Sequence, residues 1–127
     1  MDFKNANELL ALCEEKNLPI SEIMRIREIE LGETASEIVN KKMTRVLGIM
    51  KDAAFSPIRQ PVKSMGGLIG GEARKLSLHA QAKKGLCGNL LQKAITYAMA
   101  TLETNASMGL IVASPTAGSA GIVPGLM

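Results

Sequence analysis

The segment from residue 113 to residue 125, ASPTAGSAGIVPG, is the part of this sequence best suited to bind a ligand. Its glycines and small side chains leave backbone N–H groups uncovered, and Pro124 suits the first turn of a helix that starts nearby. Uncovered amides at the start of a helix attract anions, and three hydroxyl side chains in the segment add donors. Because the segment lacks the lysine of a nucleotide-binding P-loop, and no GxGxxG pattern is present, a small carboxylate is the expected ligand.

A second segment of the same kind, SMGGLIGG at residues 64–71, precedes a predicted helix that carries Lys75. Its four glycines permit the same exposure of backbone amides, so it is a second candidate for anion binding. Glycine-rich turns also serve as tight corners between packed elements, without any ligand. Both interpretations stay open for both segments at this point.

The composition argues against several other kinds of chemistry. Cys13 and Cys87 are the only cysteines and have no metal-ligand spacing, so we expect reduced thiols, no zinc site and a cytoplasmic protein. The single histidine, His79, is expected on a helix surface. Residues 39–127 carry eleven basic and three acidic side chains, but only three aromatic residues occur in the whole chain. Since bases would have almost nothing to stack on, we expect no nucleic-acid partner.

Apolar residues at helical spacing predict an all-α fold of about five helices, with the start of a sixth. Residues 1–54 form an N-terminal scaffold of two or three helices, and the third should begin with a capping box between Thr34 and Glu37. Residues 55–71 are rich in proline and glycine and are predicted to be a connection. The whole chain is expected to form one structural domain.

Residues 72–127 are predicted to form a helical core that carries the segment 113–125. Its first helix should end at Gly85, with Lys83 and Lys84 in the last turn. Its second helix should be central, because small residues on it allow a neighbouring backbone to approach closely: Ala94, Ala98, Ala100 and Ala106. The uncharged stretch 104–127 contains prolines and glycines that suit a membrane helix poorly, so we expect a buried loop and no membrane partner.

Two longer stretches, GGLIGGEARKL (66–76) and LETNASMGLIVASPTAGSAGIVPG (102–125), closely resemble the alpha subunit of bacterial iron-sulfur-dependent L-serine dehydratases. The resemblance covers essentially the whole chain. It implies a lyase of amino-acid degradation and gluconeogenesis that converts L-serine to pyruvate and ammonia, without pyridoxal phosphate. In this family a [4Fe-4S] cluster held by three cysteines binds the substrate hydroxyl as a Lewis acid, and a beta subunit or beta domain completes the active site.

The resemblance also suggests roles for individual residues. It implies that one group holds the substrate: Lys75, Ser114, Thr116, Ala117, Gly118, Ser119 and Gly121. A second group is expected to orient the first, or to form a buried polar network without touching substrate: Glu103, Asn105, Gly70 and Gly71. It does not identify the catalytic base.

The cluster cysteines of the family lie downstream of the loop that 113–125 resembles, and neither Cys13 nor Cys87 matches them. We therefore expect an N-terminal portion of an alpha subunit that binds no metal and is inactive alone. Its exposed apolar surface should lead to self-association, or else its last residues should be disordered. The alternative is a non-catalytic helical module that mediates assembly, in which the glycine-rich segments only pack. This alternative rests on an acidic N-terminal segment and a basic remainder.

Overall fold

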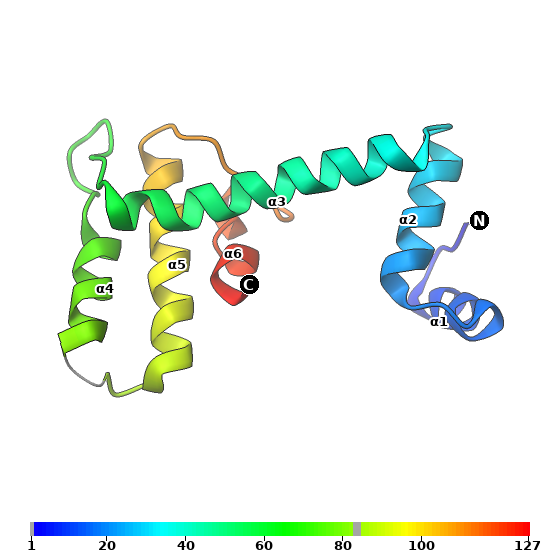
Figure 1. Ribbon diagram of the computed structural model, residues 1–127, viewed down its shortest axis with the longest axis horizontal. Coiled ribbons are helices and arrows are strands. Elements are labelled where there is room, and N and C mark those ends of the chain that lie inside the picture. Colours follow the sequence, from blue (N-terminus) through cyan, green and yellow to red (C-terminus); the bar gives the residue numbers. More distant parts are fainter. Residues whose placement is uncertain (1, 83–84) are drawn as a thin grey trace. The chain divides into compact units, whose positions relative to one another are not determined.

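The computed structural model describes residues 2–82 and 85–127, and within them all regular structure is helical (Figure 1). This confirms the predicted all-α class. The elements are α1 (Ala6–Lys16), α2 (Ile20–Leu31), α3 (Ser36–Arg59), α4 (Glu72–Ala82), α5 (Gly88–Ala106), the short 3₁₀ helix η1 (Ala117–Ser119) and α6 (Ile122–Leu126). None of the helices among these residues is long and apolar enough to cross a membrane.

The chain forms two compact units, residues 1–45 and residues 46–127, and α3 contributes to both. In the first unit, the Asn5 side chain caps α1 by accepting from the Glu8 amide at 3.0 Å. The α1 helix ends at Lys16 and is capped by Asn17, which adopts a left-handed conformation with φ of 51°. Ile23 of α2 is fully buried and forms the centre of this small unit.

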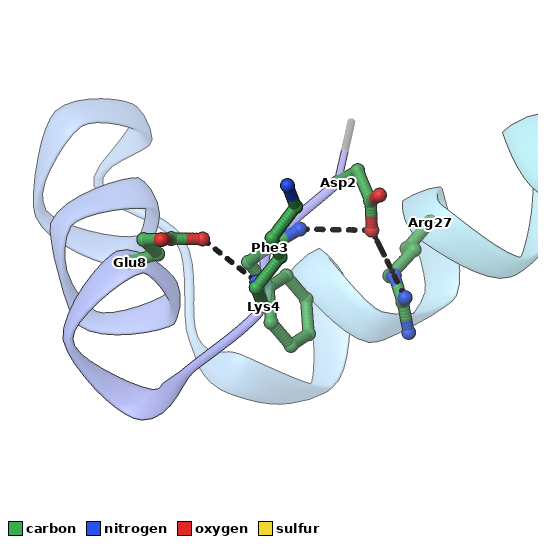
Figure 2. Close-up of polar contacts among 5 residues, drawn as sticks. All are labelled: Asp2, Phe3, Lys4, Glu8 and Arg27. Carbon is green, nitrogen blue, oxygen red and sulfur yellow. Dashed lines mark hydrogen bonds and ion pairs between the residues drawn. The ribbon is translucent and has the colours of Figure 1, made fainter.

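The residues before α1 are held against α2 by a charged contact (Figure 2). One Asp2 carboxylate oxygen accepts from Nε and Nη2 of Arg27 at 3.2 and 3.0 Å. The Arg27 guanidinium also lies over the Phe3 ring, 4.6 Å from its centroid. The Lys4 amide donates to Glu8 of α1 at 2.7 Å, so the start of the chain is tied to both α1 and α2.

The structure corrects two predictions about α3. The capping box is wrong, because α3 begins at Ser36 and the Thr34 hydroxyl donates instead to the Gly32 carbonyl oxygen at 2.7 Å. The expected end of the helix before residue 55 is also wrong. The helix continues through Pro57 to Arg59, although proline removes a backbone donor.

In the second unit, α5 lies between α4 and α6 and packs against both, which confirms its predicted central position (Figure 1). Ala53 and Ala54 of α3, Ala73 of α4 and Ala100 of α5 are buried in the core of this unit. The α4 helix ends at Ala82, so the predicted last turn with Lys83 and Lys84 lies outside the described residues. The α5 and α6 helices and the loop between them form the candidate site.

Candidate functional site

The loop from 113 to 121 is shaped by hydrogen bonds among its own hydroxyl groups. Thr116 accepts from the Ser119 amide at 3.3 Å, and the Thr116 amide donates to the Ser119 hydroxyl at 3.2 Å, so the two residues cap η1 reciprocally. The Ser119 hydroxyl donates to the Ser114 carbonyl oxygen at 3.0 Å, across a cis bond between Ser114 and Pro115. These side chains therefore determine the course of the loop, and Gly118 lies within the turn that they close.

A cavity of about 340 Å³ lies between this loop and α5. The loop contributes Ala117, Gly118 and Gly121 to its wall, and the start of α6 contributes Ile122. One face of α5 forms the other side, with Ile95, Ala98, Leu102 and Asn105 among its residues. Most of the wall is apolar, so the few polar groups in it determine what could bind there.

Asn105 is the principal side chain with free hydrogen-bonding capacity in this wall. The side-chain amide of Asn105 forms no hydrogen bond with any described residue. The hydroxyl of nearby Thr101, in contrast, already donates to the Tyr97 carbonyl oxygen at 3.0 Å. Within the described part of the chain, the backbone amides of Ala117 and Gly118 also lack a hydrogen-bond acceptor. Three residues that line the cavity thus have a hydrogen-bonding group without a partner, namely the Asn105 side chain and the Ala117 and Gly118 backbone amides, and such groups in an apolar wall suit a small polar ligand.

The second glycine-rich segment differs, because its last two backbone amides already donate hydrogen bonds to carboxylate groups of the same chain. Glu103 of α5 accepts from the Gly71 amide at 3.1 Å and from the Ala73 amide at 2.7 Å. Glu72 accepts from the Gly70 amide at 2.7 Å. The amides of Gly70, Gly71 and Ala73 are therefore not available to an external anion in this structure.

Lys75 lies in the first turns of α4 with an exposed side chain, and it is not part of the cavity wall. Its charge acts on Glu72 instead. The Gly70 amide, which donates to Glu72, holds the pKa of that carboxyl below its ordinary value, and the Lys75 charge acts in the same direction. Of the residues proposed to hold substrate, the structure brings Ala117, Gly118 and Gly121 to the cavity, while Ser114, Thr116 and Ser119 shape the loop behind them.

The described residues do not fit an iron-sulfur cluster. Cys13 lies on α1 and Cys87 precedes α5, and both are free. No group of three histidine, cysteine, aspartate or glutamate side chains among the described residues is placed to hold a metal ion. His79 is exposed on α4, which confirms its predicted surface position.

Sequence reasoning missed the α5 side of the cavity, although a signal was present. Counting back from Asn105 at helical spacing reaches Leu102, Ala98 and Ile95, which all line the cavity. Asn105 and these apolar residues therefore share one face of α5. Their spacing alone would have predicted that this face packs against the loop 113–121.

Comparisons with known proteins agree with the resemblance. A family model described as "Serine dehydratase alpha chain" matches residues 15–127. The chain is 42% identical over 125 residues to a probable L-serine dehydratase alpha chain of Bacillus subtilis, covering 98% of this chain and 41% of that protein. It is 35% identical over 125 residues to the L-serine dehydratase alpha chain of Peptoniphilus asaccharolyticus, covering 98% of this chain and 43% of that protein. The chain thus spans about two fifths of the length of these relatives. No solved structure matches it.

Proposed function

We propose that this chain, which belongs to the serine dehydratase alpha chain family, has a role in an L-serine ammonia-lyase. It would supply a scaffold and part of the substrate site of that enzyme. The complete enzyme would convert L-serine to pyruvate and ammonia. We expect the enzyme to act in the cytoplasm, in amino-acid degradation and gluconeogenesis. A beta chain or beta domain would complete it, since relatives named as alpha chains imply a partner chain.

The observation that carries this proposal is the cavity between α5 and the loop 113–121. L-serine is small and bears a carboxylate, an ammonium group and a hydroxyl. Backbone amides at Ala117 and Gly118 suit a carboxylate, and the Asn105 side chain can both donate and accept. The apolar remainder of the wall would limit competing water, which strengthens these hydrogen bonds.

The resemblance implies a [4Fe-4S] cluster, for which the described residues offer no ligand set. We infer that its ligands belong to the part of the protein that corresponds to the remaining length of the relatives. The role proposed for these residues is accordingly restricted to binding and orienting the substrate. On this proposal the 127 residues alone have no dehydratase activity.

The test is the Asn105→Ala variant of the full-length enzyme assembled with its partner chain. Loss of one hydrogen bond to a charged or polar substrate group, about 1–2 kcal/mol, should lower kcat/KM for L-serine roughly 5- to 30-fold. The matched control is Asn89→Ala, because Asn89 is an exposed asparagine at the start of the same helix and lies outside this cavity. If both variants retain the kinetic constants of the parent enzyme, Asn105 does not contact the substrate.

The alternative function, a non-catalytic assembly module, is favoured by a different observation. Large apolar side chains are exposed on the first unit, including Leu10, Ile20 and Leu31. Such surface is typical of a contact with another protein, either a partner or a second copy of the chain. Unchanged kinetics in Asn105→Ala, together with loss of subunit assembly in Leu10→Ser, would support this alternative over the substrate site.

A further inference from the structure

Glu103 is a buried carboxylate at the centre of the second unit. Its exposed fraction is only 1%, and it is among the largest fully buried side chains of the chain. Burying a carboxylate without compensating hydrogen bonds is very unfavourable. Here both carboxylate oxygens are used, since Oε1 accepts from Ala73 at 2.7 Å and Oε2 accepts from Gly71 at 3.1 Å. The Glu72 carboxyl group also lies within hydrogen-bonding reach of Glu103.

The position of these donors explains why a carboxylate is suitable. They belong to the start of α4, where the first backbone N–H groups have no partner within the helix and the helix dipole is positive. A residue just before the helix normally supplies the capping oxygen. Gly71 stands directly before α4 and has no side chain, so it cannot cap the helix itself. Glu103 supplies the oxygens from a helix 30 residues later in the chain.

We propose that Glu103 is a positioning residue: an internal anion that fixes the start of α4 and the Gly70–Gly71 turn to the last turns of α5, and thereby sets the place of Asn105. Successive residues of a helix are rotated by about 100°, so Glu103 and Asn105 point to opposite sides of α5. Between them, Thr104 donates to the Ala53 carbonyl oxygen of α3 at 2.9 Å. The end of α5 is thus held on two sides, and the third side carries the asparagine of the cavity. This last step rests on the proposed function, whereas the anion assignment does not.

The assignment is tested by removing the Glu103 side chain and supplying a small carboxylate ion in solution. In the full-length protein, Glu103→Ala should lower Tm by roughly 10 °C, because two buried amides lose their acceptor. Sodium formate should restore at least a third of this loss, since formate is small enough to occupy the vacated space between the same amides. Sodium chloride at equal ionic strength should restore much less. Glu14→Ala, at an exposed glutamate of α1, controls for general salt effects.

A second variant keeps the assignment testable if Glu103→Ala does not fold. Glu103→Gln retains the shape, but its NH₂ group must face a backbone donor. Hydrogen exchange at Gly71 and Ala73 should therefore quicken at least about tenfold, more than at the other end of α4. Equal protection of these amides in parent and Glu103→Gln, or no greater response to formate in Glu103→Ala than in the parent, would overturn the assignment.

The link to the cavity is measured separately, in the enzyme assembled with its partner chain. Glu103→Ala should raise KM for L-serine at least fivefold, with a smaller change in kcat, and formate should reverse most of the rise in KM. A change in Tm without a formate-reversible change in KM would refute the positioning role. Measuring Asn105→Ala in parallel distinguishes this from failure of the proposed function. If Asn105→Ala alters KM while Glu103→Ala does not, the substrate site stands and the positioning role fails.

Discussion

The Thr104 hydroxyl of α5 lies 3.1 Å from the Ala100 carbonyl oxygen of its own helix, and its shorter hydrogen bond, at 2.9 Å, goes to the Ala53 carbonyl oxygen of α3. In a regular helix the amide four residues later would donate to this carbonyl group. That residue is Pro57, which has no N–H. Thr104 therefore supplies the donor that Pro57 removes, and this contact explains how α3 continues past the proline to Arg59.

Thr104→Val should accordingly destabilise the second unit by about 1–2 kcal/mol, because a part-buried carbonyl group loses its donor while the shape is retained. Chemical denaturation of the full-length protein measures this loss. Thr96→Val is the matched control, since the buried Thr96 hydroxyl bonds only to the Gln92 carbonyl oxygen of its own helix. Thr104→Val should cost more than Thr96→Val.

The Pro57→Ala background tests the stated cause. Alanine restores an amide at position 57 that can donate to the Ala53 carbonyl oxygen, so Thr104→Val should cost at least about 0.5 kcal/mol less in that background. A double-mutant cycle on the denaturation data gives this difference directly. An identical cost in both backgrounds would mean that Thr104 does not compensate for the proline.

This contact also shows where sequence-based prediction succeeds and where it fails for this fold. Helices with an apolar stripe were predictable, because the stripe is visible within one segment. The end of α3 was mispredicted, since the donor that compensates for Pro57 lies 51 residues beyond Ala53. Local patterns carry no information about a partner at that separation.

The candidate site and its surroundings likewise include features that the sequence predicts and features that only the fold reveals. The loop 113–125 and Asn105 could be selected from residue types and from the family resemblance. The capping of α4 could not, because its acceptor, Glu103, lies on another helix. The glycines at 70 and 71 suggested free amides, and only the fold shows that carboxylates of the same chain occupy them.

Gly121→Ala should destabilise the packing of α6 on α5. A Cβ at this position would lie 2.9 Å from the Ala98 carbonyl oxygen and 3.3 Å from its Cα atom, and backbone atoms cannot move aside cheaply. This confirms the predicted close approach at Ala98. We expect a loss of about 1–3 kcal/mol in thermal or chemical unfolding. Gly118→Ala is the control in the same loop, because its nearest contact would be the Thr116 hydroxyl at 3.8 Å, and it should be nearly neutral for stability.

Gly70→Ala should disrupt the turn before α4 more severely. Gly70 has φ of 148°, and a Cβ there would lie 2.7 Å from both the Lys63 Cα atom and the Val62 carbonyl oxygen. Strain and overlap should together cost about 2–4 kcal/mol. Gly66→Ala, in the same segment, meets no atom within 4 Å and serves as the comparison in calorimetry. Similar melting temperatures for the two variants would contradict the packing of this turn against residues 62 and 63.

Acidification should release the contact between Asp2 and Arg27 in the first unit. The hydrogen bond from Arg27, aided by the Phe3 amide, holds the pKa of the Asp2 carboxyl below its ordinary value of 3.8. A carboxyl group with a lowered pKa in the folded protein stabilises it above the ordinary value, and this contribution is lost as the pH falls through the lowered pKa. The contact should therefore be complete at neutral pH and disappear only below about pH 3.8.

Titration of the Asp2 carboxyl carbon by NMR measures this shift directly. Arg27→Gln should move the midpoint upward, toward 3.8, because the charged donor is removed. Arg25→Gln is the matched control on the same helix, since Arg25 contacts Glu22 and Ser36 rather than Asp2. If Arg25→Gln raised the midpoint as much as Arg27→Gln, a general loss of positive charge would explain the shift and the specific contact would not.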